Sequence, residues 1–297
     1  MRITYCSTRF ASRLLEAEPF SPMPFLDRTD IELVHPDIPR GHVRYALFDF
    51  DGTLSLIREG WQSVMIPMMV EILMQTPRHE SEDELRAVVT EFVERLTGEQ
   101  TIYQMIRLAD EVARRGRQPA APQEYKRQYH ARLWARIGGR VAALKSGRIA
   151  PDEMLVPGAL EFLKALRARG VTCYLASGTD EPFVCDEAAA LGIAGYFAGI
   201  YGARDDYLRA TKKAVIEQIM RGHGLSGVEF VAFGDGHVEI ENAKSVGGLA
   251  VGVASSEAER RGVNRWKRER LIGAGADVIV PDFREGDVLI QYFLGEK

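Results

Sequence analysis

Short apolar runs that end at a turn recur along this chain, and helical patterns separate them. We predict strands at residues 43–48, 171–176, 228–233 and 249–253, with a fifth candidate at 277–280. Such runs, closed by glycine-containing turns, are typical of buried strands. Strands that alternate with helices form parallel sheets covered on both faces. The sequence therefore predicts an α/β fold.

Residues 57–150 differ, because they show no strand pattern. Apolar residues recur there at steps of three and four, which indicates helices with one buried face. The three stripes run from Trp61 to Ile72, from Leu85 to Leu96 and from Tyr125 to Ile137. We therefore expect an all-α insertion between the first strand and the rest of the sheet.

The insertion divides the chain into three parts. Residues 1–42 hold five prolines, too many for a helix, and we expect an irregular N-terminal arm that packs on a domain. The sheet would be built from residues 43–56 and 151–297, and the helical domain from residues 57–150.

Composition excludes several classes of protein. Hydrophobic residues make up 46% of the 297 and charged residues 27%, which is ordinary for a globular protein. The net charge of −4 provides no basic field for nucleic acid or an anionic membrane. No apolar run approaches the roughly 20 residues that span a bilayer, and the first residues lack the apolar core of a secretory signal. We expect a cytoplasmic protein, and the sequence leaves its oligomeric state open.

Two acidic residues follow the first predicted strand, in the segment Asp49-Phe-Asp51-Gly-Thr-Leu. Carboxylates two residues apart in a strand point roughly the same way. In an open parallel sheet, ligands bind at the carboxyl ends of the strands. Both acids are therefore candidates for a binding crevice, although a lone Asp-x-Asp is more often a solvated turn.

Polar residues follow two further strands. Ser177 and Gly178 offer a hydroxyl and backbone amides at a helix start, where anions bind. Asp235 and Glu239 lie one helical turn apart, a spacing that suits a hard cation, directly or through water. Each pattern alone is equally typical of an ordinary helix start.

Charge balance favours combining these residues with Lys212 or Lys213, which precede an amphipathic helix. The acids 49, 51, 235 and 239 would bring four negative charges into one crevice, and close carboxylates raise one another's pKa. A divalent cation and one lysine would nearly balance them. Mg²⁺ prefers oxygen ligands and often bridges carboxylates to a phosphate. The sequence thus predicts a Mg²⁺-dependent phosphate site.

In their order along the chain, these four segments resemble the haloacid dehalogenase superfamily of phosphohydrolases. The segments are Asp49-Phe-Asp-Gly-Thr-Leu, Leu175-Ala-Ser-Gly-Thr, the lysine at 212 or 213, and Gly234-Asp-x-x-x-Glu239. The pattern is most similar to the phosphoglycolate-phosphatase-like branch. This resemblance implies a Rossmann-like core, with residues 57–150 as an inserted all-α cap domain.

The resemblance also implies the catalytic roles. Asp49 corresponds to the nucleophile that forms an aspartyl-phosphate, and Asp51 to the general acid and base. Ser177, the Gly178 amide and Lys212 would bind the phosphate, with Lys213 as the alternative lysine. The Mg²⁺ ligands would be Asp49, the backbone carbonyl of Asp51, Asp235, and Glu239 directly or through water.

Two departures from the family pattern bear on the substrate and the metal. Glu239 replaces the aspartate of many relatives, which leaves room for a water between side chain and metal. The residues after Leu54 differ from those common in phosphoglycolate phosphatases, which weakens any prediction of phosphoglycolate as substrate.

We therefore expect a phosphatase of a small phosphorylated metabolite, either a sugar phosphate or a short phospho-acid. The alternatives are a sugar-phosphate mutase of the same superfamily and a non-catalytic or receiver-like phosphate-binding protein. Candidates for substrate contact in the cap are Arg58, Glu59, Trp61, residues 98–101 and Arg107. The basic stretch 260–270 is interpreted as a solvated helix.

Overall fold

A computed structural model describes residues 25–26, 28–204, 206–207 and 211–296, and these contain one seven-stranded sheet. The strands are β1 (Glu32–Leu33), β2 (Tyr45–Phe48), β3 (Thr172–Asp180), β4 (Phe197–Ala203), β5 (Phe230–Gly234), β6 (Leu249–Val253) and β7 (Val278–Val280). Their order is β1-β7-β6-β5-β2-β3-β4. Every neighbouring pair is parallel except β1 and β7. The predicted parallel α/β fold is confirmed.

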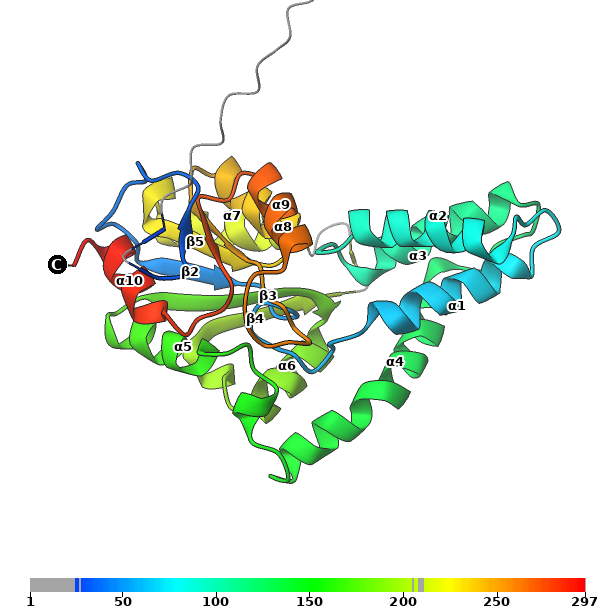
Figure 1. The fold of residues 1–297 in the computed structure, drawn as a ribbon, viewed down its shortest axis with the longest axis horizontal. Helices are drawn as coiled ribbons and strands as arrows, with labels where there is room; N and C mark the ends of the chain where they lie inside the picture. Colours follow the sequence, from blue (N-terminus) through cyan, green and yellow to red (C-terminus); the bar gives the residue numbers. More distant parts are fainter. Residues whose placement is uncertain (1–24, 27, 205, 208–210, 297) are drawn as a thin grey trace, which may run out of the picture.

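Helices cover both faces of this sheet (Figure 1). One face carries α5 (Ala159–Ala168), α6 (Glu181–Ala190) and α10 (Gly286–Leu294), and the other carries α7 (Lys212–His223), α8 (His237–Ser245) and α9 (Arg265–Gly273). Short 3-10 turns lie at Pro151–Glu153, Ala194–Tyr196 and Gly227–Glu229. Strand β2 contributes side chains to the cores on both faces of the sheet, because Phe48 belongs to one buried cluster and Leu47 to the other.

Four helices occupy the stretch between β2 and β3, and Figure 1 shows them as a unit beside the sheet. They are α1 (Gln62–Met74), α2 (Glu82–Arg95), α3 (Thr101–Arg114) and α4 (Pro122–Lys145). Their apolar stripes pack against one another, with Leu85, Phe92 and Leu133 buried. We call residues 57–150 the cap. Helix α3 is an addition to the three stripes that the sequence predicts.

Two strands lie where the sequence predicts none. Strand β1 falls within the expected arm of residues 1–42, of which residues 1–24 and 27 lie outside the described residues. Strand β4 contains Gly199 and Gly202, which interrupt any alternation of apolar and polar residues. None of the described helices is both long enough and apolar enough to cross a bilayer.

Aromatic rings fill the core beneath β2. Phe48 stacks on Phe233 with 4.6 Å between ring centroids, and Phe162 stacks on Phe283 at 4.7 Å. Phe162 also meets Phe233 edge-on at 5.3 Å. Such contacts add specific geometry to the apolar area that the rings bury.

Phe162→Ala should destabilise the protein by about 3–5 kcal/mol, because it leaves a cavity among rings that have no room to collapse. Phe162 is 2% exposed, whereas Phe25 is 59% exposed. Phe25→Ala should therefore change stability by less than about 0.5 kcal/mol. Denaturant unfolding of both variants measures the difference. Equal effects would contradict this account of the core.

Candidate active site

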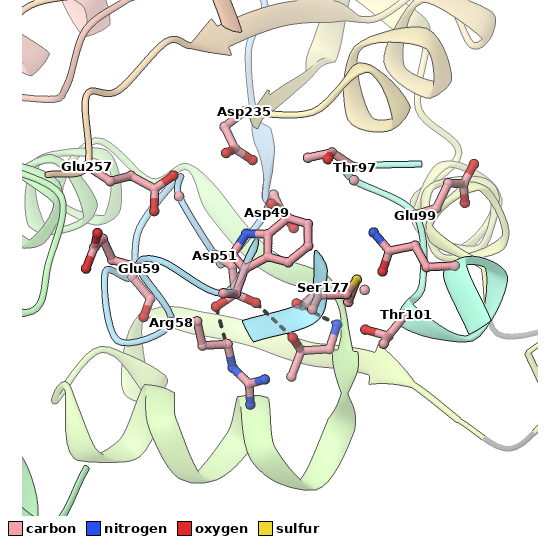
Figure 2. Close-up of a pocket in the computed structure, with 18 of the residues that line it drawn as sticks. Asp49, Asp51, Arg58, Glu59, Thr97, Glu99, Thr101, Ser177, Asp235 and Glu257 are labelled. Atoms are coloured by element: carbon pink, nitrogen blue, oxygen red, sulfur yellow. Dashed lines mark hydrogen bonds and ion pairs between the residues drawn. The ribbon is translucent and has the colours of Figure 1, made fainter. Parts of the chain in front are cut away.

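The order of the strands directs attention to the end of β2. From β2 the chain proceeds to β3 and β4 on one side, and β5, β6 and β7 follow on the other. Ligands of open α/β sheets bind where the strand order reverses in this way. Asp49 follows β2 directly and Asp235 follows β5, so both lie at this reversal (Figure 2).

A cavity of about 90 Å³ lies between these strand ends and the cap. The core residues at its wall include most of those that the sequence predicts for the site. They are Asp49, Asp51, Ser177, Gly178, Lys212 and Asp235. Glu239 does not line the cavity, although it lies directly behind it. The structure thus brings together six of the seven predicted site residues at one cavity.

Lys212 connects Asp49 to Glu239. Its Nζ donates a hydrogen bond to Asp49 Oδ1 at 2.7 Å and contacts the Glu239 carboxylate. All three side chains are buried, with Glu239 at 0% exposure. Lys213, the alternative lysine, is exposed. Glu239 therefore contacts the lysine, and its predicted part in binding a metal, directly or through water, stays a prediction.

Asp51 lies beside Asp49, and its two carboxylate oxygens have different surroundings. Oδ2 accepts a hydrogen bond from the Thr179 hydroxyl at 2.8 Å. Oδ1 is buried, accepts no hydrogen bond from the described residues, and lies 3.7 Å from Arg58 Nε. One oxygen is thus fixed by a hydrogen bond, and the other lies near the Arg58 charge without one.

Burial raises the pKa of both aspartates to about 6. For Asp49 the Lys212 charge opposes this shift, and the charges of Asp235 and Asp51 add to it. For Asp51 the Arg58 charge opposes the shift, and Glu187 and Asp235 add to it. A carboxyl with a pKa near the working pH is suited to general acid–base catalysis.

The Ser177–Gly178 turn lies close to the cap. The Ser177 Oγ accepts a hydrogen bond from the Thr179 amide at 3.1 Å, which fixes the turn. A Cβ on Gly178 would lie 2.7 Å from the Glu99 carbonyl oxygen. Only glycine therefore fits at 178, because the cap loop packs directly against it.

The carboxylates of Asp49 and Asp235 fit Mg²⁺ by their chemistry, since they supply hard oxygen donors at one cavity, and the third predicted protein ligand is the backbone carbonyl of Asp51. In the described part of the chain, no three acidic, histidine or cysteine side chains form a ready metal cluster. Mg²⁺ commonly needs only one or two carboxylates, with waters and substrate phosphate completing its shell.

Lys267 is a buried residue of the site that the sequence analysis missed. It lies on α9, inside the stretch interpreted as solvated, yet it is 7% exposed. Its Nζ donates to Asp235 Oδ2 at 2.8 Å and to Glu257 Oε1 at 2.7 Å. The expectation of a solvated helix was therefore wrong for this side chain. A signal was present, because Lys267 lies four residues before the fully buried Leu271 and so on the same helix face.

Gly52 completes this side of the site. Its φ is +77°, and a Cβ would lie 2.3 Å from Asp235 Oδ2. Its carbonyl accepts a hydrogen bond from the Ser255 hydroxyl at 2.6 Å, and Ser255 Oγ lies 3.3 Å from Lys267 Nζ. The turn after Asp51 therefore depends on glycine both for its backbone conformation and for the approach of Asp235.

Two cap arginines that are candidates for substrate contact pair with acidic side chains of the protein. Arg58 lines the cavity, but its Nε and Nη2 donate to Glu187 on α6 at 3.1 and 2.6 Å. Arg107 is not among the residues that line the cavity. It pairs with Glu111 and lies 5.7 Å above the Phe92 ring. Arg107, a candidate for substrate contact, therefore has the packing role that is the more common one for such a residue.

The sequence matches a known family of enzymes. The family model of the haloacid dehalogenase-like hydrolases matches residues 43–247, more than half of the chain. The chain belongs to this family. A search of functionally characterised proteins found no significant sequence match.

Solved structures similar to this hydrolase share its fold at low sequence identity. A predicted phosphoglycolate phosphatase from Haemophilus somnus 129pt is 20% identical, with a TM-score of 0.56 over 84% of this chain and 97% of that one. A predicted phosphatase from Clostridium acetobutylicum is 19% identical, with a TM-score of 0.55 over 84% and 99%. CbbY from Rhodobacter sphaeroides, in complex with xylulose-(1,5)bisphosphate, is 18% identical, with a TM-score of 0.52 over 82% and 96%.

Lys267→Met should destabilise this hydrolase by about 3–5 kcal/mol at pH 8, because it leaves Asp235 and Glu257 without their cation. Burial raises the pKa of Glu257. The deficit should therefore shrink toward pH 5, where protonation neutralises the unpaired Glu257 carboxylate.

The exposed Lys213→Met is the control, and its effect should be small at both pH values. Thermal unfolding at pH 5 and pH 8 measures the two variants. A deficit for Lys267→Met that does not change with pH would contradict the ion-pair account.

Proposed function

We propose that this chain is a phosphatase that hydrolyses a small phosphate monoester through an aspartyl-phosphate on Asp49, with Mg²⁺ as cofactor. The observation that carries the proposal is the position of Asp49, buried at the end of the central strand with Lys212 Nζ 2.7 Å from Oδ1. Asp51, Asp235 and the Ser177–Gly178 turn line the same cavity. The family membership of the chain supports hydrolysis.

In the first step, Asp49 attacks the phosphorus. Lys212 occupies Oδ1, so Oδ2 is the attacking oxygen. The bond between phosphorus and the ester oxygen breaks, and Asp51 gives its proton to that oxygen as the alcohol leaves. A covalent intermediate divides one difficult hydrolysis into two easier steps.

In the second step, Asp51 acts as a base. Its carboxylate takes a proton from water while the water oxygen attacks phosphorus, and the bond to Asp49 breaks. Inorganic phosphate leaves, and both aspartates return to their starting states. Thr179 holds Asp51 Oδ2, which keeps Oδ1 directed for both proton transfers.

The phosphoryl oxygens need donors and positive charge throughout. Ser177, the Gly178 amide and Lys212, which line the cavity, would bind them. Mg²⁺, held by the Asp49 and Asp235 carboxylates and the Asp51 backbone carbonyl, would supply further charge stabilisation to the transferring group. Glu239 keeps Lys212 in place through their direct contact.

The proposal includes the division of the chain. Residues 43–56 and 151–297 would form the catalytic core, residues 57–150 the cap, and residues 1–42 an arm. Helices α1 to α4 fall inside the proposed cap range, which supports it. A phosphatase releases inorganic phosphate, whereas the alternative mutase would return an isomerised sugar phosphate.

Asp49→Asn should reduce release of phosphate from p-nitrophenyl phosphate by at least about 10⁴-fold, because the amide cannot act as nucleophile. Asp51→Asn should cost about 10²–10⁴-fold, the usual range for a general acid or base. Asp186→Asn is the matched control, since Asp186 is exposed and pairs with Lys145. Circular dichroism verifies folding. Retained activity in Asp49→Asn would refute the proposed nucleophile.

Chelation with EDTA should abolish phosphate release, and added Mg²⁺ should restore it, because carboxylates outnumber cationic groups at the cavity. Asp235→Asn should raise the Mg²⁺ concentration for half-maximal activity by at least about tenfold. A Mg²⁺ titration of wild type and variant measures this shift. Full activity after exhaustive dialysis against EDTA would exclude the metal requirement.

A further inference from the structure

We propose that the alcohol released by this enzyme carries no second anionic group, and that it is a small, uncharged, hydroxylated compound. The inference rests on the proposed phosphatase function and concerns the part of the substrate that faces the cap. It chooses between the two substrate classes that the sequence leaves open, in favour of sugar or polyol phosphates over phospho-acids.

In the part of the core that the structure describes, the cavity wall offers no unpaired cation for a second anion. Of the described residues at its wall, Lys212 is the cationic side chain that the core supplies. Lys212 is engaged by Asp49 and Glu239, and it serves the phosphoryl group in the proposed reaction. Among the described residues, a carboxylate or second phosphate of the substrate would therefore need its partner on the cap.

The cap, every residue of which is described, places one cation at the cavity wall, and that is Arg58. Arg58 is 7% exposed and donates two hydrogen bonds to Glu187, which is itself 1% exposed. Its guanidinium also lies 5.7 Å above the Phe183 ring. Figure 2 shows it directed away from the Asp235 side of the cavity. Recruiting it for a substrate anion would leave Glu187 buried without a partner, which is costly.

Two further cap cations, Arg140 and Lys126, also pair with acidic residues. Arg140 Nη2 lies 3.2 Å from Glu59, and Lys126 contacts Asp180. Glu59 and Glu99 are the acidic side chains that the cap adds to the cavity wall. Of the described residues at the cavity wall, both cations are already paired, so a second substrate anion would meet like charge there, and such placement is strongly unfavourable.

The remaining cap groups at the wall suit an uncharged polyol. Thr97, Thr101, Gln104 and Tyr129 offer hydroxyl and amide groups that both donate and accept hydrogen bonds. Trp61 and Met65 add apolar surface, against which the carbon–hydrogen face of a sugar can pack. The cavity volume of about 90 Å³ favours a short alcohol in this arrangement of cap and core.

The test compares substrates that differ only in this charge. One pair is glycerol 3-phosphate and 3-phosphoglycerate, and the other is 2-hydroxyethyl phosphate and phosphoglycolate. In each pair a hydroxymethyl group replaces a carboxylate. The value of kcat/KM should be at least about tenfold higher for the uncharged member of each pair, because like charges in one site repel. p-Nitrophenyl phosphate, measured alongside, reports the phosphatase activity itself.

Each result of these assays either supports or overturns the inference. If p-nitrophenyl phosphate is not hydrolysed, the proposed function fails, and this inference fails with it. If p-nitrophenyl phosphate is hydrolysed while the anionic members match or exceed the uncharged ones, the inference alone is overturned. Hydrolysis of p-nitrophenyl phosphate with both pairs inert also overturns it, because the proposal requires that small uncharged esters are accepted.

A charge added to the cap provides a second measurement. Thr101→Lys places a cation at the cavity wall and should reduce the preference for the uncharged members of both pairs at least about threefold, because the new charge can pair with a carboxylate. Gln118→Lys adds the same charge at an exposed cap position and should leave the preference unchanged. Equal ratios in the two variants and wild type would contradict the account.

Discussion

The compensation of buried charge at the end of β2 determines the arrangement of the residues around it. Six carboxylates gather there with three cations. The acids are Asp49, Asp51, Glu187, Asp235, Glu239 and Glu257, and the cations are Arg58, Lys212 and Lys267. Each cation contacts two of the acids, so none of the three is free to move independently. The acids named here exceed the cations in number, and a bound divalent cation would reduce this excess of negative charge. The excess thus connects the fold to the proposed Mg²⁺ chemistry.

The positions of the acids could be predicted from the sequence, whereas their partners could not. Asp49 and Asp235 follow recognisable strands, and parallel strands bring their carboxyl ends to one edge. Lys212 could be chosen over Lys213 because it shares the buried face of α7 with Ile216, four residues later. The link from Lys267 to Asp235 depends on how α9 docks, and no local pattern encodes that distance. The same holds for the turn of Arg58 toward Glu187.

The strands that escaped prediction show where packing overrides local pattern. Gly202 in β4 lies so close to α6 that a Cβ there would be 2.3 Å from the Glu181 Cα. The glycine that allows this approach also removes the side chain by which a strand is recognised. Strand β1 is two residues long, and its Glu32 pairs with Arg268 across the sheet edge. Its pairing with β7 is a tertiary contact that its own few residues could not reveal.

The same close packing explains why a glutamate can stand at position 239. Its Cβ and Cγ pass 2.8 Å from the place where a Cβ on Gly234 would be, so the side chain crosses over a residue that must be glycine. This path brings the carboxylate to Lys212, whose Nζ reaches Asp49 at 2.7 Å. Glu239 thus supports Lys212 beside Asp49, the proposed nucleophile. Glu239 packs over Gly234 and contacts Lys212, which in turn contacts Asp49. A side chain added at position 234 would therefore displace Glu239 and disturb the Lys212 contact with Asp49.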